Sequence, residues 1–195
     1  NPNLRPSRSS APEFLTGPGN GIQLSAGPHD GRLIFPVYIF GNPYYSAIIY
    51  SDDHGATWQR DGMAGNGGGE IQIAETPNGG LLASMRDNNF SWSGVRTFSR
   101  STDGGLTWDM LFTNTTNPPT IPDPQCQGSN LRFSTTNDSN RSRLVFANCD
   151  SSSSRVAMTL RLSYDEGQTW AVSNLVYSGT SGYSGTLVAQ MTLNL

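Results

Sequence analysis

SDDHGATW at Ser51–Trp58 is the first of three copies of one pattern in this chain. The other two are STDGGLTW at Ser101–Trp108 and SYDEGQTW at Ser163–Trp170. All three share Ser-x-Asp-x-Gly-x-Thr-Trp, and their first residues lie 50 and 62 positions apart. Three matches to so specific a pattern at this spacing indicate an internal repeat, each unit having the size of one four-stranded propeller blade.

The residue types of the repeat predict a structural turn. Asp and Ser side chains bond backbone N–H groups in tight turns, Gly readily adopts positive φ, and Trp covers a gap between strands or blades. The fourth and sixth positions vary freely, and His54 occupies one of them. We therefore expect Asp53, Asp103 and Asp165 to be structural, and we expect neither a metal site nor a His-dependent nucleophile here.

Short apolar segments around each copy predict four strands per repeat. They are 21–24, 32–40, 46–50 and 57–63 in the first set, 70–76, 80–86, 95–101 and 107–113 in the second, and 130–135, 143–149, 157–163 and 169–177 in the third. The repeated pattern forms the turn between the third and fourth strands of each set. No long segment has a helical period, so we expect an all-β protein in which the chain after Val176 begins a further blade.

The composition excludes several classes of protein. Charged residues make up 14% of the 195 residues, and the net charge of −3 argues against a nucleic-acid-binding surface. No segment approaches the run of about 18 apolar residues that a membrane helix requires. The cysteines, Cys126 and Cys149, are too few for a zinc site. They favour a disulfide in a secreted protein, with two buried free thiols as the alternative.

The three copies resemble the Asp boxes of the sialidase (neuraminidase) superfamily, six-bladed β-propellers that cleave terminal sialic acids. Further segments share the resemblance in the family's order: GPGNGIQL…GRLIFPVY at 17–38, GEIQIAETPNGGLLASMRD at 69–87, SRVAMTLRLSYDEGQTW at 154–170 and SGYSGTLV at 181–188. The resemblance covers essentially the whole chain. It implies that residues 1–195 supply about three complete four-stranded blades, and part of another, of a sialidase-type β-propeller.

The resemblance also implies a set of site residues. Glu70 matches the family's catalytic Glu, and Tyr183 matches its nucleophile. Arg86 and Arg155 match two members of its substrate-binding Arg triad. The chemistry is consistent, because Arg binds a carboxylate through two charge-assisted bonds, and a neutral Tyr nucleophile is not repelled by the substrate's carboxylate. The implied activity is that of a retaining exo-α-sialidase without a cofactor, in which Glu70 takes the phenolic proton as Tyr183 attacks the anomeric carbon.

Neighbouring residues offer alternatives to this set. Glu75 is a second carboxylate on the same segment, but five positions along a strand place it on the opposite face. Tyr177 is a second tyrosine in the segment of the nucleophile. Arg96 and Arg161 are expected to pair with other groups on strand faces. The loop after residue 87 adds two candidates for the acyl or aglycone side of the site, Phe90 and Trp92.

The sequence departs from the family's pattern in two places. Family members begin with an Arg-Ile-Pro segment that carries the first triad Arg, followed by an Asp that acts as acid and base. No Arg-Ile-Pro occurs here, and Arg5 and Arg8 lack that context. The pair at 185–186, Gly-Thr, also interrupts the usual continuation after the nucleophile. We therefore expect the C-terminal portion of a catalytic propeller that is inactive alone, with the missing first half or a second chain as its partner.

Two other functions remain open from the sequence. An Asp-box propeller could bind the sialic acid of glycans as a lectin does, without hydrolysis, or the chain could be an inactive fragment. A third possibility is action on another polysaccharide, in which case the matches at Glu70 and Arg86 are coincidental.

Overall fold

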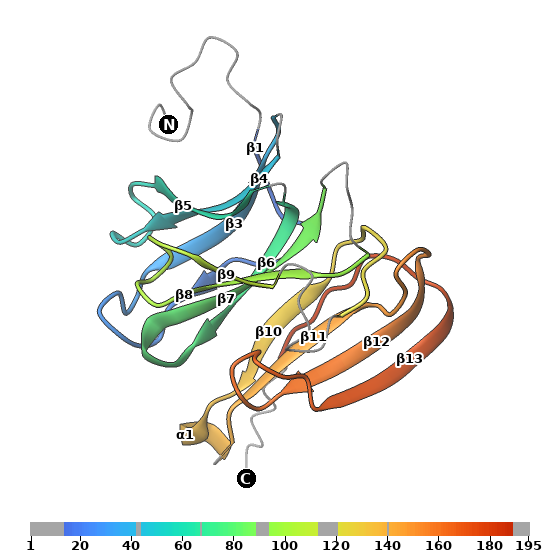
Figure 1. The fold of residues 1–195 in the computed structure, drawn as a ribbon. Helices are drawn as coiled ribbons and strands as arrows, with labels where there is room; N and C mark the ends of the chain where they lie inside the picture. Colours follow the sequence, from blue (N-terminus) through green and yellow to red (C-terminus); the bar gives the residue numbers. More distant parts are fainter. Residues whose placement is uncertain are drawn as a thin grey trace.

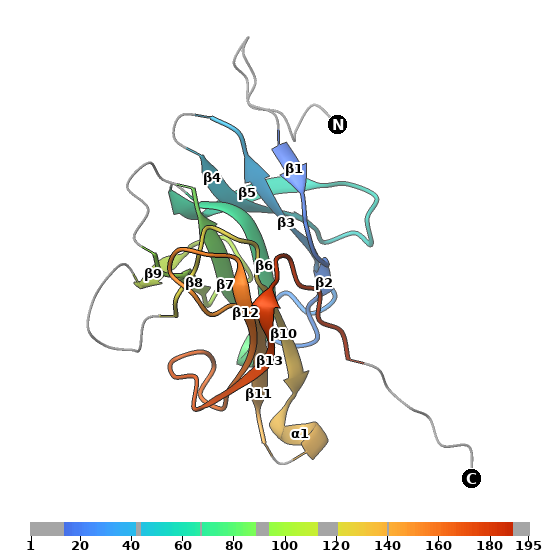
Figure 2. The same cartoon turned by 90° about the vertical axis from the view of Figure 1, so that its right-hand side faces the viewer.

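The computed structural model describes residues 14–41, 44–66, 68–88, 94–112, 121–139 and 141–188. These residues form three antiparallel sheets that follow one another along the chain (Figure 1). In a second view the first sheet again lies beside the second, and the second beside the third (Figure 2). Within the described residues, the only helical segments are α1 (Thr136–Ser139) and a 3-10 turn at Pro77–Gly79. The predicted all-β architecture of propeller blades is confirmed.

Each sheet contains the four strands predicted from its apolar segments. The first sheet comprises β1 (Phe14–Thr16), β2 (Ile22–Gln23), β3 (Leu33–Ile39), β4 (Tyr45–Ser51) and β5 (Gln59–Asn66). The second comprises β6 (Gly68–Thr76), β7 (Gly80–Asp87), β8 (Thr97–Ser101) and β9 (Asp109–Phe112). The third comprises β10 (Ser129–Ser134), β11 (Arg143–Cys149), β12 (Val156–Ser163) and β13 (Val172–Thr180).

Strand order follows sequence order in the second and third sheets, as in a meander. In the first sheet both β1 and β2 pair with β3, and β1 was not predicted from the sequence. At the other end of the chain β13 continues to Thr180, and residues 181–188 contain no strand. The further blade expected after Val176 therefore does not begin within the described residues.

The second sheet is covered on both faces, and the third sheet is open at its last strand. All six residues from Gly80 to Met85 on β7 are buried, which is the pattern of a strand packed between two layers. Most residues of β13 are exposed, including Leu175 and Tyr177. The middle sheet is therefore the packing centre of the described part of the chain.

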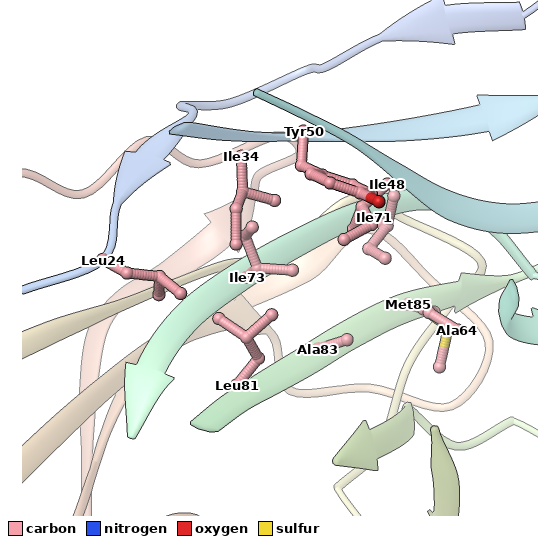
Figure 3. Packing of buried hydrophobic residues seen from close by; sticks show 10 residues of the cluster. All are labelled: Leu24, Ile34, Ile48, Tyr50, Ala64, Ile71, Ile73, Leu81, Ala83 and Met85. Carbon is pink, nitrogen blue, oxygen red and sulfur yellow. The ribbon is translucent and has the colours of Figure 1, made fainter. Parts of the chain in front are cut away.

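An apolar core fills the space between the first and second sheets (Figure 3). Its buried side chains are Leu24, Ile34, Ile48, Tyr50 and Ala64 from the first repeat and Ile71, Ile73, Leu81, Ala83 and Met85 from the second. Trp108 of the second Asp box packs against this core. Burial of one Leu or Ile side chain stabilises a fold by about 1.5–3 kcal/mol, so this interface holds the two sheets together.

An aromatic cluster fills the space between the second and third sheets. Phe98 and Phe146 meet edge to face with ring centroids 5.5 Å apart. Trp170 of the third Asp box lies 5.9 Å from Phe98 and 5.6 Å from Phe146, measured between ring centroids. The Trp of the second and of the third Asp box thus covers the gap between its own sheet and the preceding one, as predicted.

The Asp carboxylate closes each box by binding the Thr four residues later. Asp53 accepts the Thr57 N–H at 2.8 Å and the Thr57 hydroxyl at 2.6 Å. The same two bonds measure 2.9 and 2.6 Å at Asp103, and 2.8 and 2.6 Å at Asp165. The Ser that opens each box donates to the same carboxylate at 2.7–2.8 Å. The eight residues therefore form a turn that is closed by its own side chains.

The backbone of the box explains which positions vary. The invariant Gly has φ of 90°, 96° and 82° in the three copies, a conformation that favours glycine. The preceding position is also left-handed, with φ of 56° at His54, 67° at Gly104 and 61° at Glu166. The fourth position thus changes residue type while its conformation is kept.

The predicted disulfide is not formed. Cys126 and Cys149 are both free and buried. The Cys149 sulfur lies 3.5 Å from the Ser181 hydroxyl and 3.6 Å from the Gly182 carbonyl oxygen. The structure therefore has the alternative of two buried free thiols.

No helix of the described residues has the length and apolar character needed to cross a membrane.

The Asp boxes make stability depend on pH. Burial raises the pKa of Asp103, but hydrogen bonds from Thr107 and Ser101 outweigh it and lower the pKa to about 2. Because this value lies below the ordinary 3.8, Asp103 stabilises the fold above about pH 4, and the contribution is lost as pH falls toward 2. The midpoint of urea unfolding should fall over this range. Asp103→Asn should lower the free energy of unfolding by about 1–2 kcal/mol at neutral pH and make it depend less on pH.

The matched control for this measurement is Asp109→Asn, which changes an exposed carboxylate on β9. This variant should unfold as the parent does at every pH. A wild-type pH profile in Asp103→Asn would contradict the role of the box carboxylate.

The free thiols can be counted directly. Burial raises the pKa of the Cys126 thiol to about 11, so the native protein should react very slowly with a disulfide reagent such as DTNB. After unfolding without reductant, both cysteines should react. If they react only after reduction, the disulfide does form and the assignment of free thiols is wrong.

Candidate functional site

Glu70 and Arg86 lie side by side on adjacent strands of the second sheet. Glu70 lies near the start of β6, and Arg86 lies near the end of β7. The pairing of Ile71 with Met85, continued by one residue, places Glu70 opposite Arg86. The register shifts between Gly68 and Ile71, so a bulge lies beside this pair. Arg86 Nη1 donates to Glu70 Oε2 at 2.9 Å.

The glycines before Glu70 lie close to side chains of neighbouring segments. A Cβ atom at Gly69 would lie 1.9 Å from Nδ2 of Asn88. The carbonyl oxygen of Gly69 accepts a hydrogen bond from the Ser46 hydroxyl of the first sheet at 2.9 Å. The Gly-rich stretch therefore allows the start of β6, which carries Glu70, to lie against Ser46 of the first sheet and Asn88 after β7.

Tyr183 reaches this pair from the far end of the chain. It lies in the segment 181–188 that follows β13. Its hydroxyl donates to Glu70 Oε1, and Arg86 Nη1 donates to the Tyr183 Oη at 3.3 Å. Glu70 is only 7% exposed, whereas Tyr183 is 51% exposed. The phenol thus faces solvent while its proton points at a buried carboxylate.

Arg155 completes the group on the other side of Tyr183. It immediately precedes β12, and its guanidinium carbon lies 5.8 Å from the centroid of the Tyr183 ring. Its Nη2 donates to the Gln125 carbonyl at 3.1 Å. The side chain is exposed and has no carboxylate partner among the described residues. All four residues matched by sequence therefore lie together, although they come from separate parts of the chain.

The surroundings keep the Tyr183 hydroxyl protonated. Burial raises the pKa of Tyr183, and the hydrogen bond to Glu70 and the charge of Glu70 raise it further. The positive charges of Arg86 and Arg155 oppose this shift without overcoming it. Because the ordinary pKa of tyrosine is already about 10, the phenol is neutral near pH 7 and can act as a nucleophile only with a base beside it.

A cavity of about 320 Å³ opens beside Glu70 and Arg86. Its lining residues are Tyr38, Phe40, Tyr44, Glu70, Arg86, Asn88 and Gln125. The rings of Tyr38 and Phe40 lie 5.0 Å apart and those of Phe40 and Tyr44 lie 5.8 Å apart, measured between centroids. The lining therefore combines a cluster of three aromatic rings with polar and charged side chains.

Five cavity residues were not predicted from the sequence: Tyr38, Phe40, Tyr44, Asn88 and Gln125. The available signal was the cluster of aromatic residues in FPVYIFGNPYY at 35–45, of which the part up to Phe40 was assigned to a strand. Gln125 has φ of 52°, which suits a constrained loop position, but no sequence pattern marks it.

The alternative residues lie elsewhere. Glu75 accepts the N–H and the hydroxyl of Ser25 at 2.9 and 2.7 Å, far along β6 from Glu70. Tyr177 is exposed on β13 and pairs with Met158. Arg96 and Arg161 form ion pairs with Asp123 and Asp150, as expected, but both Arg side chains are buried. Phe90 and Trp92 lie outside the described residues.

No group of three or more His, Cys, Asp or Glu side chains that could hold a metal ion occurs in the part of the chain that the structure describes.

Comparisons with known proteins agree with this architecture. The BNR repeat-like domain family matches residues 5–194. The sialidase of Micromonospora viridifaciens is 37% identical over 176 residues, which cover 88% of this chain and 26% of that protein. The structure of a Hadza microbial sialidase superposes with a TM-score of 0.75 at 30% identity, covering 88% of this chain and 32% of that one. A leech intramolecular trans-sialidase superposes with a TM-score of 0.71 at 28% identity, covering 88% and 26%.

This chain spans about a quarter to a third of the length of these relatives. The family match extends over nearly all of it, and the three Asp boxes lie at corresponding turns of three consecutive sheets. The chain therefore belongs to the sialidase superfamily of BNR-repeat (Asp-box) proteins.

Proposed function

We propose that this chain supplies the nucleophile side of an exo-α-sialidase site, which hydrolyses terminal sialic acids of glycans with retention of configuration. The observation that carries the proposal is the hydrogen-bonded group of Tyr183, Glu70 and Arg86, in which the phenol donates directly to the carboxylate. A tyrosine bonded to a buried base beside an arginine is the arrangement required for an activated neutral nucleophile.

In the first step Glu70 accepts the phenolic proton while the Tyr183 oxygen attacks the anomeric carbon. A bond forms between that carbon and the Tyr183 oxygen, and the glycosidic C–O bond breaks as an acid protonates the leaving oxygen. Water then attacks the anomeric carbon and gives a proton to the conjugate base of that acid, which is thereby regenerated. The bond between that carbon and the Tyr183 oxygen breaks, and Glu70 returns the proton to Tyr183. Two inversions at the same carbon give net retention.

Two arginines are available for the substrate carboxylate. Arg155 is exposed, and its described hydrogen bond goes only to a backbone carbonyl, so its guanidinium can still bind an anion. Arg86 lies between the base and the nucleophile, where a bound carboxylate would place the anomeric carbon near Tyr183. Planar, permanently charged guanidinium groups suit this recognition.

The aromatic lining of the cavity is consistent with a sugar substrate. Tyr38, Phe40 and Tyr44 offer an apolar surface with two hydroxyl groups, and Asn88 and Gln125 add polar side chains to the same cavity. Pockets of this kind, mostly apolar with a few directional polar groups, orient a small ligand. The sequence has no counterpart of the first triad Arg or of the acid, so we assign both to other blades of the assembled propeller or to a second chain.

Tyr183→Phe tests the nucleophile. In the complete protein that carries this chain, the substitution removes the attacking oxygen and should lower kcat on a fluorogenic sialoside on the order of 10³-fold or more. The folded structure and the binding of a sialic acid analogue should persist, because half of the ring is exposed. The matched control is Tyr177→Phe, on the exposed strand β13, which should leave turnover unchanged. Unchanged turnover in Tyr183→Phe would show that Tyr183 is not the nucleophile.

The 195-residue chain alone should not cleave sialosides. It lacks the proposed acid and the first triad Arg, so assays of the isolated chain and of the chain joined to the remaining blades should differ sharply. Robust activity from the isolated monomer would overturn the claim that part of the site lies elsewhere. Calorimetric binding of sialic acid by the complete protein, with no product after long incubation, would instead favour the lectin-like alternative.

A further inference from the structure

We propose that Gln127 is a positioning residue for Tyr183, acting through the peptide group that joins Tyr183 to Ser184. The inference rests on the proposed sialidase function and adds to it the group that sets the orientation of the nucleophile. Gln127 does not line the cavity beside Glu70 and Arg86. Its effect on the reaction is therefore indirect.

The backbone that carries Tyr183 is not part of a sheet. Residues 181–188 belong to no strand, so no sheet ladder fixes the backbone at Tyr183. The ring is 51% exposed, so packing does not fix it either. Gln127 Oε1 accepts the N–H of Ser184 at 2.9 Å. That N–H belongs to the peptide group that contains the Tyr183 carbonyl, so the bond restrains the peptide plane next to the nucleophile.

Gln127 is itself rigidly held. Its exposure is 1%, and it lies in the segment 121–128 before β10. A buried ion pair fastens this segment, since Arg96 Nη1 donates to Asp123 Oδ2 at 2.8 Å and to the Cys126 carbonyl at 2.7 Å. Asp123 Oδ1 in turn accepts the Cys126 N–H at 2.9 Å. These bonds therefore hold Gln127, whose Oε1 accepts the Ser184 N–H, in one position.

The amide of Gln127 is not explained by packing. Its Nε2 is buried and has no hydrogen-bond partner among the described residues. An unsatisfied buried donor is unfavourable, so an apolar residue of equal size would fill the space at lower cost. The bond from Ser184 to Oε1 is the contact that an amide makes here and a hydrocarbon cannot.

Other anchors allow the fold to survive without this bond. The Ser184 hydroxyl donates to the Ala147 carbonyl at 2.9 Å and lies 3.0 Å from the Ser129 hydroxyl. The Ser181 N–H donates to the Arg155 carbonyl at 2.8 Å. These contacts tie the segment to the third sheet on both sides of Tyr183. Loss of the Gln127 bond should therefore change the orientation of Tyr183 without detaching its segment from the third sheet.

Gln127→Met removes the acceptor and keeps the length of the side chain. In the complete protein, kcat on a sialoside should fall about 10- to 100-fold, because a displacement of about 1 Å at a reacting group costs up to 10²-fold. KM should change less than about twofold, since Arg86 and Arg155 do not contact Gln127. Gln127→Glu keeps an acceptor oxygen at the same position and should restore most of kcat. The matched control is Gln72→Met, which removes another buried glutamine, bonded to the Pro18 carbonyl at 2.8 Å.

A second measurement does not depend on activity. The ¹³Cζ resonance of Tyr183, assigned through Tyr183→Phe, reports its hydrogen bond to Glu70. It should shift or broaden in Gln127→Met and remain in place in Gln72→Met. An unchanged Tyr183 resonance would overturn the proposal, and so would equal losses of kcat in the two Met variants or a loss confined to KM.

The same pair of readouts separates the two proposals. If the complete wild-type protein cleaves no sialoside but the Tyr183 resonance moves in Gln127→Met alone, the sialidase function fails while Gln127 still orients Tyr183. If the wild type is active and the resonance does not move, the positioning role fails while the sialidase function stands.

Discussion

The bond between an Asp carboxylate and the Thr four residues later is the constraint on which the three sheets depend. It closes an eight-residue turn and thereby fixes the direction in which the following Trp leaves the chain. In the second and third copies that Trp enters the gap before its own sheet, where it meets Ile and Leu side chains or a pair of Phe rings. One local hydrogen-bond pattern thus sets a long-range contact. The Asp carboxylate stabilises the turn most when it is ionised. The packing of the sheets therefore depends on the ionisation of side chains that do not line the cavity.

Stacking places the site where the sheets meet. Glu70 and Arg86 come from the middle sheet, and the aromatic residues come from β3 of the first sheet and the connection between β3 and β4. Arg155 and Tyr183 lie just before and just after the last two strands of the third sheet. No single sheet contains more than part of the group. Small changes in how two sheets pack therefore act on the distance between nucleophile and base. This explains why the segment 121–128, which joins the second sheet to the third, carries buried charges that hold it in one place.

Local features of the sequence predicted what local bonds determine. The Asp boxes could be predicted because every partner lies within eight residues, and the four strands of each sheet follow from alternating apolar segments. Glu70 and Arg86 lie on adjacent strands of one hairpin, so their proximity is also nearly local. Tyr183 is more than a hundred residues from Glu70 and was found only through a resemblance to a family. Tyr38 and Gln125 could not be found, because their place in the cavity depends on how separate sheets stack. The state of Cys126 and Cys149, which are free in the structure, could not be derived from the sequence, because the spacing of two cysteines does not fix the geometry of their sulfurs.

The arginines illustrate why residue type alone does not identify a site. Arg32, Arg96, Arg132 and Arg161 each have a carboxylate within the chain, and these pairs tie separate segments of the chain together. A guanidinium whose charge is already balanced gains little from a further anion, and breaking a buried pair is costly. Arg86 is paired with Glu70, whereas Arg155 has no carboxylate partner among the described residues. The charge that is left unbalanced at the site is therefore that of Arg155, beside the ring of a neutral phenol. An arriving carboxylate supplies the missing negative charge there without repelling the group that is to attack.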